Sequence, residues 1–269
     1  GSEHMNILSV NNLNFKYFDK VIFNNFSFDL KERTINVVLG TNSSGKTTLV
    51  KILSGMLKFD GTIQIHDQML SKKNIKKYSR LIGVSFYNKF LFQDVISELV
   101  FSLENLNFSS EEIKKRLNKI CNILEMHDIK NRKISSLSNF EKAKVILAST
   151  IIHEPKLIIL DELFDELTYN EYCIINDYIK KLIKEYNVTF LYTTNNLDKC
   201  LHADCILFIN KGNLILNGKV DYILEHDNTL SKEGIFIPTM IDLSLKLKFY
   251  GLVDKIIMDN ESLVDILWK

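Results

Sequence analysis

The sequence predicts an α/β protein in which a mostly parallel core sheet is joined by an antiparallel β lobe, a helical subdomain and a small C-terminal helical appendage. Three observations predict this class. A β-rich run over residues 34–39 ends at a glycine-containing loop that leads into a helical pattern. The run Leu157–Leu160 is short and wholly apolar, as expected of a central parallel strand. The stretch 93–152 between them has a helical period.

The N-terminal part predicts strands. Apolar and polar residues alternate in short segments over 7–30, and this alternation is typical of antiparallel strands. A helix is expected over 46–56. The dipeptide Asp60-Gly61 indicates a turn before a strand over 62–65, and one more buried strand is expected over 81–86.

The middle of the chain predicts the helical subdomain, over about 88–152. Ser109 and Glu112 have the spacing of a capping box at the start of a helix. One apolar helical face follows, which comprises Ile113, Leu117, Ile120, Cys121 and Leu124.

After the Leu157–Leu160 strand, the pattern predicts a helix over 169–185 and a strand over 188–192. Another strand pair flanks Lys211-Gly212-Asn213. The tail over 238–268 is expected to form the helical appendage.

Composition narrows the class of function. Of the 269 residues, 46% are hydrophobic and 25% are charged, which excludes a disordered chain and a fibre. Thirty-four basic against thirty-three acidic residues give a net charge of +1, so no general attraction to nucleic acid is expected. The cysteines and histidines lack metal-site spacing, and we expect reduced, idle thiols. No apolar run approaches the ~18 residues that span a bilayer, so any membrane role must come through a partner.

The glycine-containing loop carries the strongest motif. Residues 40–47 match G-x-x-x-x-G-K-[ST] at every fixed position, with a strand before and a helix after. The glycines let backbone N–H groups approach phosphates, and the helix directs its positive end at the same anion. Lys46 adds a charge at the β- and γ-phosphates, and the Thr47 hydroxyl can bind Mg²⁺. The expected nucleotide-binding residues are Gly40, Thr41, Asn42, Ser43, Ser44, Gly45, Lys46, Thr47 and Thr48.

An acidic pair closes the apolar strand. Asp161 is expected to act as the Mg²⁺ partner, and Glu162 is the candidate catalytic residue that orients or deprotonates the attacking water. A solvated acidic pair at a strand end is the alternative.

The phosphate loop, the acidic pair and the helical stretch between them resemble the ATPase subunits of ABC transporters, over nearly the whole chain. The resemblance implies a P-loop NTPase core that binds ATP, and head-to-tail dimers that hold two ATP molecules. Tyr17 lies where the family places an aromatic residue against adenine. The segment 137–141, Leu-Ser-Asn-Phe-Glu, lies where the family carries its LSGGQ signature.

The tail is similar to the C-terminal extension of energy-coupling factor (ECF) vitamin importers, in which two ATPases drive a transmembrane coupling protein. The matching segments are 238–247, 250–252 and 261–264. The alternative is an unrelated amphipathic helix pair. On this resemblance the ATP-binding domain covers 5–230 and the extension covers 231–269.

Several family positions are not kept. Tyr87 replaces the glutamine that touches Mg²⁺, Thr194 replaces the switch histidine, Leu163 replaces a proline, and Thr168 replaces an aspartate. The signature glycines become Asn139 and Phe140, a change that would hinder the approach of backbone to a partner's γ-phosphate. Ser138 and Glu141 then also fit a plain capping box at the start of a helix over 139–152.

The favoured function is an ATP-binding and ATP-hydrolysing subunit of an ABC-type importer, of the ECF type, on the cytoplasmic face of the membrane. The expected partners are a second ATPase subunit, in a heterodimer rather than a homodimer, and a transmembrane coupling protein. Two alternatives stay open: a catalytically weak regulatory subunit of a heterodimer, and a soluble ABC-type ATPase. Co-purification with a membrane protein would favour the transporter, and co-sedimentation with ribosomes would favour the soluble ATPase.

Overall fold

The centre of the molecule is a six-stranded sheet. The computed structural model describes residues 5–86 and 89–268. The strand order is β10-β9-β3-β8-β7-β6, and all neighbours from β9 to β6 pair in parallel, whereas β10 is antiparallel to β9. The strands are β3 (Ile35–Leu39), β6 (Ile82–Ser85), β7 (Leu157–Leu160), β8 (Thr189–Thr194), β9 (Cys205–Asn210) and β10 (Asn213–Gly218). The predicted α/β class with a mostly parallel core sheet is confirmed.

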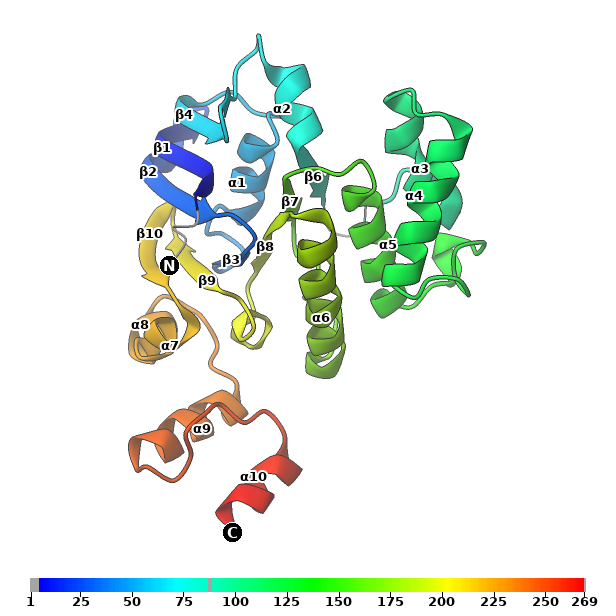
Figure 1. Ribbon diagram of the computed structural model, residues 1–269. Helices are drawn as coiled ribbons and strands as arrows, with labels where there is room; N and C mark the ends of the chain where they lie inside the picture. The colour runs from blue at the N-terminus through cyan, green and yellow to red at the C-terminus, as the bar shows by residue number, and fades with distance from the viewer. Residues whose placement is uncertain (1–4, 87–88, 269) are drawn as a thin grey trace.

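A second, antiparallel sheet forms the N-terminal lobe (Figure 1). Its order is β2-β1-β4-β5. The strands are β1 (Asn6–Tyr17), β2 (Lys20–Lys31), β4 (Asp60–Ile65) and β5 (Gln68–Met69). The turn expected at Asp60-Gly61 is wrong, because both residues belong to β4 and Asp60 pairs with Asn14. At this position strand pairing therefore outweighs the turn propensity of Asp60-Gly61.

The central strands β3, β7 and β8 are buried on both faces, which explains why the β7 sequence is continuously apolar. Side chains alternate between the faces, so Val38 and Ile159 join the cluster that includes α1 (Lys46–Leu53) and the antiparallel lobe. Val37 and Ile158 join the cluster beneath α6 (Tyr169–Tyr186). The core sheet is therefore held between two apolar layers.

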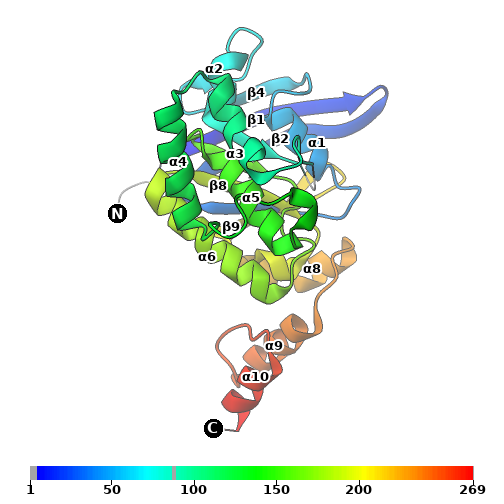
Figure 2. The ribbon, with the colours of Figure 1, turned by 90° about the vertical axis from the view of Figure 1, so that its right-hand side faces the viewer.

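The helical subdomain lies beside the β6 edge of the core sheet and in front of it in Figure 2. It contains α3 (Val95–Asn105), α4 (Ser110–Ile123) and α5 (Asn139–Ile151), while α2 (Ile75–Leu81) precedes β6. The Ser109 cap is confirmed, since its Oγ accepts the Glu112 N–H at 3.2 Å. The Glu112 carboxylate instead pairs with Arg116 at 2.9 Å, so the reciprocal half of that box is absent.

The C-terminal part holds four helices, α7 (Val220–Leu224), α8 (Asp227–Lys232), α9 (Thr239–Phe249) and α10 (Asn260–Leu267). The sequence did not indicate α7 and α8, because five or six residues are too few to show a helical period. Helix α8 spans the predicted boundary between residues 230 and 231, and the division into two domains stays a prediction. In Figure 1 the appendage, α9 and α10, lies below the rest of the molecule.

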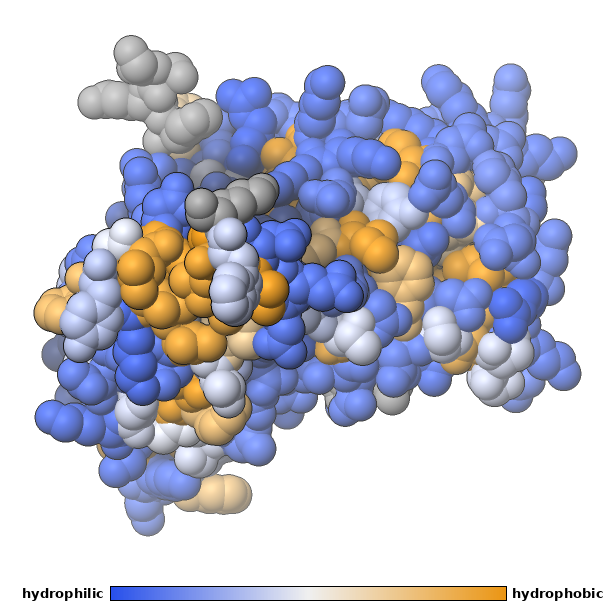
Figure 3. Space-filling view, turned by 90° about the horizontal axis from the view of Figure 1, so that it is seen from below, coloured by the Kyte–Doolittle hydropathy of each residue, from blue (hydrophilic) through white to orange (hydrophobic). Residues whose placement is uncertain are grey.

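The appendage has a small core of its own and an exposed apolar face. Its core contains Val253, Ile257 and Leu263. The Ser244 hydroxyl of α9 accepts the Ile257 N–H and donates to the Ile257 carbonyl, and it thereby joins α9 to the segment before α10. Figure 3 shows apolar side chains gathered over the appendage. The exposed members include Leu243, Phe249, Leu252, Val264 and Leu267.

The contact between β6 and α5 generates a stability prediction. A Cβ added at Gly83 would lie 2.0 Å from the Thr150 carbonyl oxygen, so Gly83→Ala must push α5 away from the sheet. We expect a loss of about 1–3 kcal/mol in the free energy of unfolding, measured with urea. Gly218→Ala is the matched control, because its Cβ would meet only the ring of Tyr222, which is exposed and able to move. Equal unfolding midpoints for both variants would contradict this packing.

Candidate functional site

Three loops meet at one edge of the core sheet because their strands run in parallel. The glycine-containing loop follows β3, the acidic pair follows β7, and Asn195 follows β8. In the pairing register Leu39 lies opposite Thr194, and Leu160 lies opposite Tyr192. The carboxyl ends of neighbouring parallel strands in an open α/β sheet are where ligands bind.

The loop after β3 is closed by its own backbone. The Ser44 N–H and hydroxyl both donate to the Thr41 carbonyl, at 3.1 and 2.7 Å. Glycine is required at position 40, since a Cβ there would lie 2.8 Å from the Ile209 carbonyl oxygen as well as 2.4 Å from the Ser44 Oγ. Gly45 caps α1 at φ 102°, a left-handed conformation that favours glycine. Because both positions are glycine, no side chain of Gly40 or Gly45 obstructs the approach of a ligand to the N-terminus of α1.

Lys46 lies inside this loop, only 3% exposed. Its Nζ donates to the Gly40 and Thr41 carbonyls, at 2.7 Å each. Burial lowers the pKa of Lys46, and the carboxylates of Glu162, Asp165 and Asp161 act in the opposite sense. The ammonium group is thus the positive centre of an acidic site.

Asp161 joins the three loops. One carboxylate oxygen accepts from the Thr47 hydroxyl at 2.9 Å, and the other accepts from the Thr193 hydroxyl at 2.6 Å. The residue is 6% exposed, so both bonds satisfy a buried charge. The structure therefore brings together Thr47 and Asp161, the two residues predicted to bind a metal ion.

Glu162 follows in a left-handed conformation, φ 55°, with its N–H donating to the Thr193 hydroxyl at 3.0 Å. Burial raises the pKa of Glu162, and the neighbouring Asp165 and Asp161 raise it further, against the effect of Lys46. A carboxylate with a raised pKa accepts a proton more readily, as a general base must. Left-handed backbone at a non-glycine residue is costly and is often found at functional sites.

Asp165 is a site residue that the sequence reasoning missed. The Thr194 hydroxyl donates to its Oδ1. Burial raises the pKa of Asp165, and the bond from Thr194 lowers it. The sequence shows Asp165 as a third acidic residue, four positions after Asp161. Only the strand order, however, shows that Asp165 meets the end of β8.

A cavity of about 500 Å³ adjoins the loop. The loop residues from Asn42 to Thr48 line one side. Lys20 of β2 and Lys211 of the β9–β10 turn line it too, and sequence reasoning missed both because the β strands bring them there. Tyr17, the residue predicted to stack on adenine, pairs with Lys20 across the β1–β2 hairpin and is 38% exposed, but it is not among the residues that line the cavity.

The segment resembling the signature begins α5 with a complete capping box. The Ser138 Oγ accepts the Glu141 N–H at 3.1 Å, and the Glu141 carboxylate accepts the Ser138 N–H at 2.9 Å. The capping prediction is confirmed, whereas a role as a signature stays a prediction. Phe140 is half-buried, with the Lys144 ammonium 5.2 Å from its ring centre.

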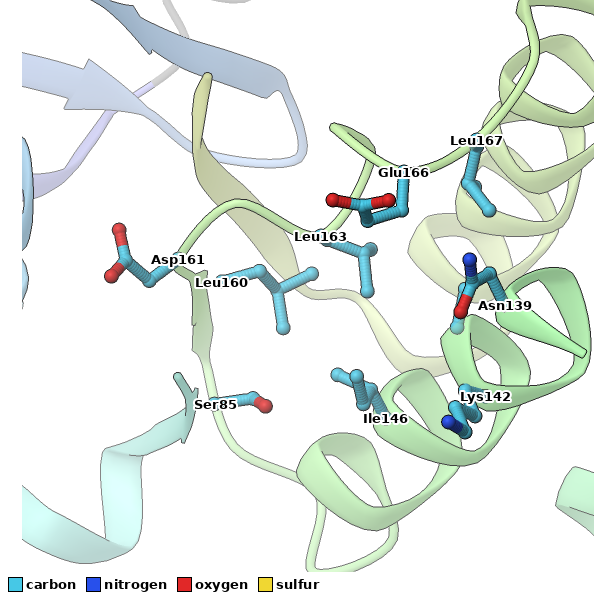
Figure 4. A pocket seen from close by; sticks show the side chains of 10 residues that line it. Ser85, Asn139, Lys142, Ile146, Leu160, Asp161, Leu163, Glu166 and Leu167 are labelled. Carbon is cyan, nitrogen blue, oxygen red and sulfur yellow. The ribbon is translucent and has the colours of Figure 1, made fainter. Parts of the chain in front are cut away.

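A small cavity lies between α5 and the segment that follows β7. Figure 4 shows Asn139 and Lys142 of α5 on one side, with Leu163, Glu166 and Leu167 across from them. The start of α5 and the segment after the acidic pair therefore face each other within one chain.

The structure shows the surroundings of three other residues that replace a family residue. Thr168 caps α6 in a capping box with Glu171, and Leu163 is buried at 7% exposure. Thr194 is wholly buried. Tyr87 lies outside the described residues.

The comparisons with known proteins agree with this site. The family model described as ABC transporter matches residues 23–165, which include the loop, the helical subdomain and the acidic pair. This chain belongs to the ABC transporter family, among its ATP-binding members. ATP binding and ATPase activity are the properties of that class.

Three relatives illustrate the likeness. The energy-coupling factor transporter ATP-binding protein EcfA1 of Ligilactobacillus salivarius is 31% identical over 239 residues, 87% of this chain and 85% of that protein. The protein of the same description from Mesomycoplasma hyopneumoniae is 30% identical over 274 residues, 98% of each chain. The solved structure of cbiO1 from Clostridium perfringens, described as part of the ABC transporter complex cbiONQ, superposes with a TM-score of 0.76 at 26% identity, over 88% of this chain and 98% of that one.

The buried Asp165 generates a prediction of pH dependence. Because its pKa is raised in the folded state, the folded protein binds the proton more tightly than the unfolded chain does. Its ionisation therefore costs stability as the pH rises from the unfolded pKa through the folded one. Asp165→Asn removes that cost while its amide oxygen still accepts from Thr194.

The measurement is thermal unfolding from pH 4 to pH 8. The stability of Asp165→Asn relative to the wild type should rise with pH. Asp177→Asn is the control, since Asp177 is exposed on α6. A relative stability of Asp165→Asn that falls as the pH rises, or that does not change with pH, would refute the assignment.

Proposed function

We propose that this chain is the ATP-binding subunit that powers an ECF-type membrane importer, and that Mg²⁺ accompanies the nucleotide. The observation that carries the proposal is the meeting of the complete phosphate loop with Asp161, through the bond from Thr47 at 2.9 Å. Relatives at 30% and 31% identity are described as ATP-binding proteins of energy-coupling factor transporters.

The phosphate loop supplies the nucleotide contacts. Backbone N–H groups between Gly40 and Thr48 and the N-terminus of α1 would surround the phosphates. Lys46 would exchange its two carbonyl partners for phosphate oxygens, which are better partners because they carry charge. Tyr17 would stack on adenine.

The two oxygen donors where the start of α1 meets the end of β7 fit Mg²⁺. The Thr47 hydroxyl and the Asp161 carboxylate are hard oxygen ligands next to each other, and Mg²⁺ in nucleotide sites takes one or two such ligands together with phosphates and water. When bound, the ion neutralises charge on the β- and γ-phosphates. Glu162 would orient the attacking water and accept its proton.

A second ATPase subunit would complete the nucleotide sites. The family resemblance puts Asn139 and Phe140 at the positions of the signature glycines, which meet a partner's γ-phosphate, so a homodimer would carry this obstacle at both sites. A heterodimer with a glycine-containing signature on the partner would complete the site of this chain. The same two residues keep the alternative of a catalytically weak regulatory subunit open. The exposed apolar face of α9 and α10 also favours a protein partner.

A transmembrane coupling protein would hold the subunit at the cytoplasmic face of the membrane. Across the described residues, helices are either too short or too polar to span a bilayer. A groove of about 510 Å³ separates α2 and β6 from α3 and exposes Leu91 and Phe101. Exposed apolar side chains in a groove suit a docking segment of such a partner.

Calorimetric titration with Mg-ATP tests the nucleotide site. Lys46→Ala should weaken binding by about 1.5–3 kcal/mol, because a charge-assisted bond to phosphate is lost. Lys51→Ala is the matched control, one turn further along α1 and away from the cavity lining. No detectable binding by the wild-type chain at millimolar Mg-ATP would overturn the proposed function.

A further inference from the structure

The Thr193 hydroxyl, near the end of β8, makes two hydrogen bonds at once. It donates to the Asp161 carboxylate at 2.6 Å and accepts the Glu162 backbone N–H at 3.0 Å. Thr193 itself is wholly buried. A hydroxyl group has one proton to donate and lone pairs that accept, so these two bonds use the group in both of its roles. One oxygen atom of β8 therefore holds both members of the acidic pair that follows β7.

The two acidic residues depend on Thr193 to different degrees. The other carboxylate oxygen of Asp161 accepts from the Thr47 hydroxyl at 2.9 Å, and the Asp161 N–H donates to the Ser85 carbonyl at 2.9 Å. Asp161 thus keeps two bonds if the Thr193 hydroxyl is lost. Within the part of the chain that the structure describes, the Glu162 N–H has no other acceptor. Loss of the hydroxyl would therefore act mainly on Glu162.

The backbone of Glu162 requires a contact of this kind. Its φ of 55° lies in the left-handed region, which a non-glycine residue adopts at a cost and keeps only where its surroundings impose it. The bond to Thr193 is such a constraint. Strand pairing in turn fixes Thr193, because β8 lies between β3 and β7 and Thr193 is opposite Val38. Without the bond, Glu162 can relax to an ordinary conformation, and its carboxylate would move with the backbone.

The position of the Glu162 carboxylate matters for hydrolysis more than for binding. A general base has to lie within hydrogen-bond reach of the water whose proton it takes, and a displacement of about 1 Å can cost about 100-fold in rate. Nucleotide affinity depends instead on the phosphate loop, on Lys46 and on the Mg²⁺ ligands. A change confined to Glu162 would therefore slow the chemical step and leave binding nearly unchanged.

Resting on the proposed function, we propose that Thr193 is a positioning residue for hydrolysis, whose hydroxyl keeps the Glu162 backbone in the left-handed conformation that directs its carboxylate at the attacking water. Thr193 contacts neither the nucleotide nor that water. It acts through Glu162, and its second bond ties the position of Glu162 to that of Asp161.

Hydrogen–deuterium exchange of the Glu162 N–H tests this constraint directly, in the chain without nucleotide. Thr193→Val keeps the shape of the side chain and removes the hydroxyl. Exchange at Glu162 should become about 10-fold faster, because the amide no longer has to break a hydrogen bond before it exchanges. Thr193→Ser keeps the hydroxyl, and its exchange rate should stay within about 3-fold of that of the wild type.

Thr189→Val is the matched control. Thr189 begins the same strand and is 1% exposed. Its hydroxyl also accepts a backbone N–H, that of Arg33 at 2.8 Å, and Arg33 is also left-handed, with a φ of 56°. The control therefore loses a comparable bond at the opposite end of β8, away from the acidic pair. Both variants should lose stability, but only Thr193→Val should change exchange at Glu162.

Kinetics separate positioning from a merely structural role. In the complex reconstituted with its partner ATPase and membrane subunits, Thr193→Val should lower kcat by about 10-fold to 100-fold. The KM for ATP should change by less than about 3-fold, and so should the Kd of this chain for the non-hydrolysed β,γ-imido analogue of ATP with Mg²⁺. Thr193→Ser should restore kcat to within about 3-fold of the wild type, and Thr189→Val should leave kcat unchanged.

Three results would overturn the inference: a wild-type exchange rate at Glu162 in Thr193→Val, an unchanged kcat in that variant, or an equal fall of kcat in Thr189→Val. Each of them leaves the proposed function standing where the wild-type complex hydrolyses ATP and Glu162→Gln removes that activity. A wild-type complex that does not hydrolyse ATP overturns the proposed function itself.

Discussion

The buried carboxylate of Asp161 is the constraint on which the site depends. It accepts one hydrogen bond from the Thr47 hydroxyl at the start of α1 and one from the Thr193 hydroxyl at the end of β8, while Asp161 itself directly follows β7. A buried carboxylate without partners would be strongly destabilised, so these two threonines and Asp161 stabilise one another's positions. The phosphate loop, the acidic pair and the β8 loop consequently keep a fixed spacing before any ligand arrives. Preorganisation of this kind reduces the entropic cost of binding.

The charge balance around Asp161 shapes the chemistry. The carboxylates of Asp161, Glu162 and Asp165 all act on the buried ammonium of Lys46, and Asp165 also interacts with Lys199. Burial raises the pKa of Glu162 and of Asp165, and the neighbouring carboxylates raise that of Glu162 further. A raised pKa suits proton acceptance by Glu162, but the excess of carboxylates also repels the phosphates, so Mg²⁺ and neutral donors have to offset that repulsion. The family resemblance puts Thr194, which donates to Asp165, in place of the switch histidine, so we expect turnover to be slow because the site would lack one electrostatic stabiliser.

The predictable parts of the molecule were those that local sequence determines. The phosphate loop, the buried strand before Asp161 and the Ser138 cap each depend on neighbouring residues, and the structure contains all three. The missed features depend on strand order. Asp165 and Asn195 meet the site only because β8 lies between β3 and β7, and Lys20 enters the cavity through the β1–β2 hairpin. Asp60-Gly61 was misplaced for the same reason, since strand pairing outweighed turn propensity.

The central claim is that this chain's own phosphate site, completed by a partner, carries out hydrolysis. The most direct measurement is the steady-state ATPase rate of the complex reconstituted with its partner ATPase and membrane subunits, with Glu162→Gln in this chain. Glutamine keeps the shape of the side chain but accepts no proton, so the rate should fall by about 100-fold or more. Glu185→Gln, at an exposed position on α6, should leave the rate unchanged. A Glu162→Gln complex as fast as the wild type would place hydrolysis in the partner's site and contradict the account.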